Sequence, residues 1–239
     1  FNNDGKIDLA STHYGAAEVG IFIGVGNGTF NLVVNYTTGT NPTSVDSADL
    51  NTDGNLDLAV ANYVSNTVSI LLGNGNGTFQ AKVDYAAGTN PWKISLKDMN
   101  ADGANDIVTS NQSATYISVL LGNKTGPTPN GTFAAKIDTS LHLPQSEAMS
   151  VADFDNDGKL DVVLVEYAAP NYMYALKGDG AGSFKAFGQT VYNAQLQPDG
   201  MVMKDFNADG ALDFAVCNYN SSTFSVFLAN KTNGVGNGT

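Results

Sequence analysis

The sequence predicts an all-β fold, specifically a β-propeller of about five four-stranded antiparallel blades. Two observations lead to this fold class. An acidic motif recurs along the whole chain, and each period between its copies holds short apolar runs separated by Gly-, Asn- and Asp-rich turns. Helical 3.6-residue periodicity is absent. The 239 residues suffice for one large all-β domain, so we interpret residues 1–239 as a single propeller domain.

The acidic motif occurs in FNNDGKIDLA, DLNTDGNLDLAV, DMNADGANDIVT, DFDNDGKLDVVL and DFNADGALDFAV. The central aspartates are separated by 49, 49, 55 and 52 residues and are Asp4, Asp53, Asp102, Asp157 and Asp209. Repeats of about 50 residues with four strands each match the blades of a propeller. A parallel β-helix would need a much shorter repeat, so it is the weaker alternative.

The second period shows the expected elements in order. A short apolar run within residues 43–50 leads into the acidic loop, and a second run follows at 56–63. A third run at 66–73 enters a glycine-rich turn that ends at Phe79, and a less regular segment at 80–91 completes the period. The runs are rich in Val, Ile, Leu, Tyr and Phe, which favours strands. Equivalent glycine-rich turns are expected at 24–30, 126–133 and 178–184.

The two ends of the repeat pattern predict that both termini fall inside a blade. The first copy lacks the strand before its loop, and the last copy stops before its final strand. One interpretation is that strands from both termini complete one blade and close a ring of about five. The alternative is that neighbouring segments of a longer or tandem-propeller chain complete it.

Composition limits the partners. The chain carries 23 acidic and 11 basic residues, all of the latter Lys, for a formal charge of −12. This charge argues against nucleic acid, whose phosphates require basic clusters, and against an anionic membrane surface. No apolar run reaches 18 residues, so membrane insertion is not expected. Cation binding is the natural expectation for clustered acids.

The acidic loop has the spacing of a calcium ligand set. Numbered from Asp49, side-chain oxygens fall at positions 1, 3, 5 and 9, and the residue at position 7 can offer a backbone carbonyl. Glycine at position 6 permits a sharp turn, so alternating oxygens can point to one centre. This resembles half of an EF-hand loop, but Val60 replaces the bidentate Glu at position 12 and the flanks are strands. Magnesium is disfavoured because it retains waters, and zinc because His and Cys are absent nearby.

These positions define one candidate calcium site per loop, up to five Ca²⁺ ions in all. Asx turns without metal are the alternative for one loop, but five phased copies favour metal. Fifteen of the 23 acids lie in the loops, where they repel one another without a cation. The candidate ligands are Asn2, Asp4, Lys6 and Asp8; Asp49, Asn51, Asp53, Asn55 and Asp57; Asp98, Asn100, Asp102, Ala104 and Asp106; Asp153, Asp155, Asp157, Lys159 and Asp161; and Asp205, Asn207, Asp209, Ala211 and Asp213.

The loop D-x-[ND]-x-D-G-x-x-D, followed by a strand and a GNGTF turn, resembles the FG-GAP/VCBS repeat, and the resemblance covers essentially the whole chain. That repeat forms the seven-bladed propeller of integrin α subunits and of many secreted proteins. The resemblance implies that the loop joins the first two strands of a blade and binds calcium. The blade count of about five departs from the family pattern.

Asn-x-Ser/Thr sequons are dense, which makes an extracellular, N-glycosylated surface plausible. Four of them share the NGT of a hairpin turn, whose chemistry alone favours that sequence. Two NKT inserts lengthen hairpins and would suit exposed glycans. The candidate acceptors are Asn27, Asn35, Asn76, Asn111, Asn123, Asn130, Asn220, Asn230 and Asn237.

The remaining polar motifs do not indicate catalysis. His13 and His142 occupy unrelated repeat positions and are interpreted as surface or structural residues, and no GxSxG, HExxH or phosphate loop is present. Cys217 lies in an apolar run and is expected to be a buried core residue. Trp92 is expected at a blade edge, with sugar stacking as a minor alternative.

The sequence thus favours a non-catalytic calcium-binding propeller with a structural or adhesive role. It would bind protein or glycan ligands, or self-associate through open blade edges as a unit of a glycosylated tandem-propeller fibre. The alternatives are a carbohydrate-binding lectin propeller and an accessory propeller of a larger secreted enzyme.

Overall fold

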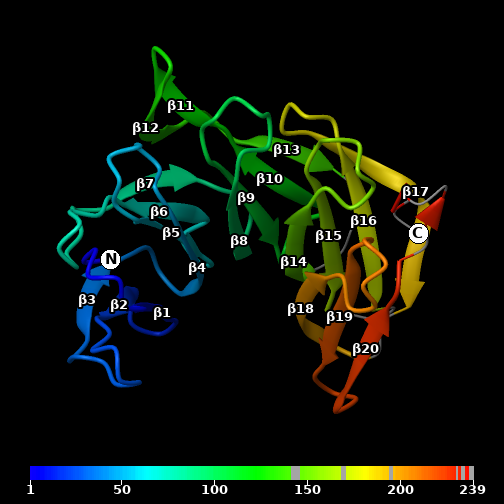
Figure 1. The fold of residues 1–239 in the computed structure, drawn as a ribbon, viewed down its shortest axis with the longest axis horizontal. Coiled ribbons are helices and arrows are strands. Elements are labelled where there is room, and N and C mark those ends of the chain that lie inside the picture. The colour runs from blue at the N-terminus through cyan, green and yellow to red at the C-terminus, as the bar shows by residue number, and fades with distance from the viewer. Residues whose placement is uncertain (141–145, 168–170, 194–195, 230, 233–234, 237–239) are drawn as a thin grey trace.

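The computed structural model describes residues 1–239 except 141–145, 168–170, 194–195, 230, 233–234 and 237–239. Its sheets are antiparallel and follow one another in chain order around an arc, from the blue sheet at the N-terminus to the red strands near the C-terminus (Figure 1). We call the five main sheets blades 1 to 5. The described residues contain no helix that could cross a membrane.

The three middle blades have the four strands that the repeat predicts. Blade 2 contains β4 (Pro42–Ala48), β5 (Asp57–Asn62), β6 (Thr67–Leu71) and β7 (Val83–Ala86). Blade 3 contains β8 (Pro91–Lys97), β9 (Asp106–Asn111), β10 (Tyr116–Leu120) and β13 (Ile137–Ser140). Blade 4 contains β14 (Ser146–Ala152), β15 (Asp161–Glu166), β16 (Tyr172–Gly178) and β17 (Phe184–Asn193).

The two end blades have three strands each in the described chain. Blade 1 contains β1 (Leu9–His13), β2 (Glu18–Phe22) and β3 (Val34–Thr37). Blade 5 contains β18 (Pro198–Lys204), β19 (Asp213–Asn218) and β20 (Thr223–Phe227). Within the described ranges, no strand of blade 1 pairs with a strand of blade 5.

Two small hairpins accompany these sheets. β11 (Gly122–Thr125) pairs with β12 (Thr128–Phe133) and extends from blade 3, where the sequence carries the NKT insert. β21 (Lys231–Thr232) pairs with β22 (Val235–Gly236) after blade 5. The sequence did not predict the first hairpin as strands, because its turn-rich composition reads as a lengthened loop.

The core lies between consecutive blades. Side chains of a strand alternate between its two faces, and β5 shows the consequence. Leu58 and Val60 pack with Val19 and Ile21 of blade 1, whereas Ala59 and Ala61 pack in the cluster shared with blade 3. Burying each Leu, Val or Ile contributes about 1.5–3 kcal/mol. Every interior blade is therefore apolar on both faces, which is why its second strand reads as a continuous apolar run.

The prediction that Cys217 is buried is wrong. Its equivalents in β5, β9 and β15 are Ala61, Ser110 and Val165; Ala61 and Val165 are fully buried core residues and Ser110 is fully buried too. Cys217 is exposed, because it lies on the face of blade 5 that packs against no further described blade. An apolar run alone does not reveal whether a neighbouring sheet covers it.

Candidate metal centres

The acidic loops have one backbone conformation in all five copies. The fourth position is left-handed throughout, at Asn3 (φ 58°), Thr52 (57°), Ala101 (57°), Asn156 (59°) and Ala208 (58°). Glycine follows two residues later with φ between 76° and 89°. A β-branched residue such as Thr52 rarely adopts positive φ, so the loop imposes this geometry on its residues. The curl brings the alternating side chains toward the loop centre.

Position 1 holds the loop closed. In blade 2, Asp49 accepts hydrogen bonds from the backbone N–H groups of Asp53 (3.2 Å) and Gly54 (2.9 Å). Asp98, Asp153 and Asp205 accept from the equivalent N–H groups in their blades. The carboxylates at position 1 therefore lie over the curled backbone, as the predicted spacing requires.

Positions 3 and 5 continue the same network. Asn51 Oδ1 also accepts from the N–H of Asp53 at 3.1 Å, and Asp53 Oδ1 accepts from the N–H of Asn55 at 2.8 Å. Corresponding bonds recur at position 3 in Asn2, Asn100, Asp155 and Asn207, and at position 5 in Asp4, Asp102, Asp157 and Asp209. The residues at position 7, namely Lys6, Asn55, Ala104, Lys159 and Ala211, donate their N–H groups here; a contribution of their carbonyls to a metal stays a prediction.

Position 9 has a second role that the sequence did not reveal. Both oxygens of Asp57 accept backbone hydrogen bonds, from Leu50 at 2.8 Å and from Gly73 at 2.7 Å. Asp106, Asp161 and Asp213 make the same pair of bonds. Asp8 accepts from Gly24 in blade 1. This buried carboxylate thus fastens the acidic loop to the turn that follows the third strand.

In blades 1 to 4 the turn approaches the loop so closely that its first residue has no room for a side chain and is glycine. A Cβ on Gly73 would lie 2.2 Å from the carbonyl oxygen of Leu56, and one on Gly178 would lie 2.1 Å from that of Leu160. Real Cβ atoms do not approach backbone oxygens so closely. In blades 1 to 4 the glycine that starts the turn therefore serves the loop as well as the turn, whereas in blade 5 Ala229 takes its place and still donates its N–H to Asp213.

Burial raises the pKa of three of the position-9 carboxylates. Asp106 and Asp161 are fully buried, and desolvation raises the pKa of each to about 6, with nearby loop aspartates adding to the effect. Burial also raises the pKa of Asp57. A divalent cation beside these groups would favour their ionised form.

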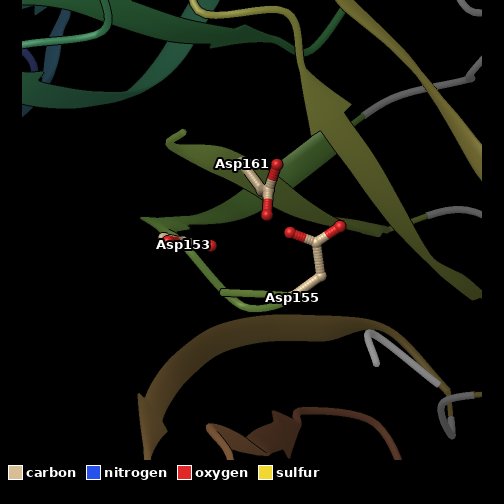
Figure 2. Close-up of side chains that lie close together, drawn as sticks. All are labelled: Asp153, Asp155 and Asp161. Carbon is tan, nitrogen blue, oxygen red and sulfur yellow. The ribbon is translucent and has the colours of Figure 1, made fainter. Parts of the chain in front are cut away.

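In blade 4 the carboxylates converge most closely. The candidate ligand oxygens of Asp153, Asp155 and Asp161 all lie within 4.8 Å of one another (Figure 2). Figure 2 shows Asp155 extending from the loop toward Asp161, which comes from the start of β15. Oxygen-only donors at this spacing fit a hard cation such as Ca²⁺ and lack the nitrogen or sulfur ligands typical of zinc.

The acidic loop of blade 4 also contacts a lysine side chain that the sequence did not predict at this site. Lys177 Nζ lies 2.8 Å from Asp157 Oδ2 and contacts Asp155 as well. Hydrogen bonds to these two acids raise the pKa of Lys177, and its ammonium lowers that of Asp157. Comparing the blades in phase could have found it, because Leu72 and Leu121 occupy the corresponding place after β6 and β10.

The structure changes part of the glycosylation prediction. Asn111 is 1% exposed and donates its amide to Tyr116 O and Ser118 Oγ, so its prediction as a glycan acceptor is wrong for the folded chain. The side-chain nitrogen of a buried asparagine that already donates hydrogen bonds inside the sheet is not accessible for attachment of a glycan. Asn27, Asn35, Asn76 and Asn220 are exposed, Asn123 and Asn130 are half-buried, and Asn230 and Asn237 lie outside the described residues.

The residues outside the loops are also placed. His13 is half-buried, with Nδ1 3.9 Å from a Glu18 carboxylate oxygen, while His142 lies outside the described residues. Trp92 lies at a blade edge, as expected, because it is the second residue of β8, the innermost strand of blade 3 and an edge strand of that sheet. Its ring meets that of Tyr63 edge to face at 5.6 Å.

Similar structures confirm the propeller architecture. A candidate 6-phosphogluconolactonase from Bacteroides uniformis is 10% identical with TM-score 0.70, and the match covers 98% of this chain and 66% of that one. One from Bacteroides fragilis is 13% identical with TM-score 0.70 and the same coverage. A catalytically inactive virginiamycin B lyase from Staphylococcus aureus with quinupristin is 13% identical, with TM-score 0.57, covering 93% and 67%. At such low identity these similarities show the fold alone.

The sequence itself matches a family model in four successive, overlapping segments. No curated protein matches the chain. The model for the FG-GAP-like repeat matches residues 1–60, 49–109, 98–164 and 153–216, so each match begins at one acidic loop and ends in the strand that follows the next. This chain belongs to the FG-GAP-like repeat family.

Proposed function

We propose that this chain is a non-catalytic, extracellular, calcium-binding β-propeller with a structural or adhesive role. The observation that carries the proposal is the identical curled geometry of the acidic loops, in which side-chain oxygens recur at the same positions. In blades 2 to 5 the loop lies between the first two strands, so a bound ion would tie these inner strands together.

Electrostatics supports calcium as a structural element. Carboxylates confined to one small loop repel one another, and burial makes ionisation of Asp106 and Asp161 costly. A divalent cation would offset both effects. Because metal binds the folded loop and not the unfolded chain, binding would stabilise the fold.

The acids of the loops also support a non-catalytic role. Two carboxylates that perform acid and base catalysis need unlike environments. Here the same hydrogen-bond pattern recurs in blade after blade. Repeated, equivalent sites suit structural ions better than a reaction centre.

The exposed sequons and the negative charge support an extracellular, glycosylated surface. We further propose self-association through the open ends of the propeller. Phe224 is 72% exposed and Val226 48% exposed on blade 5, and Leu9 is 48% exposed on blade 1. Their equivalents are covered in interior blades, so a second copy could cover them in a fibre-like assembly. Sedimentation that shows only a monomer at all protein concentrations would contradict the proposed self-association.

The central test is thermal unfolding with excess calcium and with EGTA, together with native mass spectrometry for the number of bound ions. We expect one ion per functional loop, up to five, and a clear loss of stability in EGTA. Unfolding that is identical in both conditions would overturn the calcium proposal. Zinc and magnesium at the same concentration are the controls for ion type.

A further inference from the structure

The end of the propeller opposite the acidic loops contains a second group of equivalent positions. In blades 2 to 5 the pairing between the first two strands shifts register at the start of the innermost strand. The second residue of that strand lies in the shift, as in a β-bulge. Bulges of this kind redirect a side chain. The residues are Thr43, Trp92, Glu147 and Asp199. The acidic loops follow the other end of these strands.

Another set of equivalent residues surrounds this group. The residue after the second strand of each of these blades is Tyr63, Gln112, Tyr167 or Tyr219. The two sets meet in a cavity of about 410 Å³ lined by Trp92, Gln112, Glu147, Tyr167, Asp199 and Tyr219. The cavity thus combines three aromatic side chains, two carboxylates and one amide from three consecutive blades.

The charged groups of this cavity are both acidic. Glu147 is only 4% exposed and accepts a hydrogen bond from the Gln112 side-chain amide, while Asp199 is exposed. Burial raises the pKa of Glu147, and the charge of Asp199 adds to the shift. Throughout the part of the chain that is described, neither carboxylate forms an ion pair within 4.0 Å. Lys93 lines an adjoining cavity of about 280 Å³ that shares Trp92 and Asp199.

A neighbouring ring holds Trp92 in place at this cavity. The Trp92 and Tyr63 rings pack edge to face with an interplanar angle of 83°, and Tyr63 lies 6.4 Å from Tyr14 in turn. Tyr219 is 71% exposed at the rim. Aromatic faces attract cations through their quadrupole, most strongly when the cation is partly desolvated.

We propose that this axial cavity binds an organic ammonium group, either a free amine or quaternary ammonium compound. The carboxylates of Glu147 and Asp199 supply the opposing charge, and Trp92, Tyr167 and Tyr219 supply the faces that contact the alkyl groups. A neutral ligand such as a sugar would leave the two carboxylates uncompensated. This site is separate from the acidic loops and does not depend on the proposed role of calcium.

The protein contains a built-in reporter for this test, because Trp92 is its single tryptophan. The calcium-saturated chain is titrated with choline chloride at constant ionic strength while Trp emission is recorded. The matched neutral compound is 3,3-dimethylbutan-1-ol, which has the same shape without the charge. We expect a saturable change with choline and none with the neutral compound. An equal response to both compounds, or no saturable response to choline, would overturn the proposal.

Variants localise the binding. Glu147→Gln and Asp199→Asn each remove one charge with little change in shape and should weaken choline binding by about tenfold. Tyr219→Leu should weaken it by about threefold through loss of a cation–π contact. Asp179→Asn, the same change in the turn between β16 and β17, should leave the affinity unchanged. Unchanged affinity in both folded carboxylate variants, or saturable binding of neutral oligosaccharides in place of choline, would contradict the assignment.

Discussion

The ammonium nitrogen of Lys177 lies 2.8 Å from a carboxylate oxygen of Asp157, inside the acidic loop of blade 4. This loop has an additional aspartate, Asp155, where blades 2, 3 and 5 have asparagine, and Lys177 contacts that residue too. The extra negative charge and the lysine thus occur together. In blade 4 the side chain of Lys177 therefore offsets part of the negative charge of the loop without a bound cation.

Replacing Lys177 by Met should strengthen calcium binding in blade 4 and weaken the metal-free protein. The ammonium competes with Ca²⁺ for the same oxygens, so its removal should raise the affinity of that loop by about tenfold. In EGTA the unfolding temperature should fall because the carboxylates lose their partner. Calorimetric titration measures the affinity, and Lys136→Met, which breaks the ion pair with Asp138 outside the loops, is the control. Equal effects of the two substitutions would contradict the competition.

Asp53→Asn should have opposite effects with and without calcium. The change removes one loop charge but keeps an oxygen for the N–H of Asn55. With calcium bound, stability should fall by about 1–2 kcal/mol and native mass spectrometry should show one ion fewer. In EGTA, stability should not fall, because repulsion within the loop decreases. Asp179→Asn, in the turn between β16 and β17, makes the same change outside the loops at a residue that accepts backbone hydrogen bonds; a loss of equal size there would remove the metal explanation.

The metal-free protein should lose stability as the pH rises from about 4 to 6. Asp106 and Asp161 have a folded-state pKa of about 6 against 3.8 for the ordinary group, so the folded state binds protons that the unfolded state has released. Their stabilising contribution is present below pH 4 and lost through pH 6, on the order of 2 kcal/mol per group. Denaturant unfolding in EGTA measures it.

Excess calcium should reverse that pH dependence. Calcium requires ionised carboxylates, so stability should increase over the same pH interval when the ion is present. Profiles that coincide with and without calcium would show that the position-9 aspartates do not sense a bound ion.

Gly73→Ala should be strongly destabilising, by about 3 kcal/mol, because the new methyl group would lie 2.2 Å from the Leu56 carbonyl oxygen. The turn would have to move away from the acidic loop, which would also lengthen the bonds to Asp57. The control is Gly200→Ala, where a Cβ meets nothing within 4 Å. Urea unfolding compares the two, and similar losses would show that the close approach is not the cause.

Cys217 should react rapidly with a thiol reagent in the native protein. Its side chain is exposed on the outer face of blade 5, and it is the single cysteine of the chain. One equivalent should be modified without denaturant at a rate close to that of the unfolded chain. Protection that increases with protein concentration would indicate that a second copy covers this face.

The repeat made most of the fold and of the loops predictable. Five copies of one motif specify the period of the repeat. Residues such as Asp49 and Gly54 indicate the curled loop, because few other residues allow that backbone conformation. The axial pair Glu147 and Asp199 was not predictable, since their convergence depends on bulges that change the strand register. The second role of Asp57 was missed because its partner Gly73 lies 16 residues away.

The sequence by itself determined the strand content, the blade order and the chemistry of each acidic loop, because these depend on local patterns repeated in phase. Only the tertiary structure decided which equivalent positions differ in environment. Cys217 and Val165 occupy the same place in their strands, but one is exposed and the other buried, because blade 5 packs on that face of β15 and none of the described blades covers the corresponding face of β19. Lys177 likewise acquires its role only where the fold carries it into the loop. Whether a side chain is buried, and which side chains meet, depends on residues that are neighbours in space. The repeat in the sequence predicts such neighbours only where one blade packs against the next.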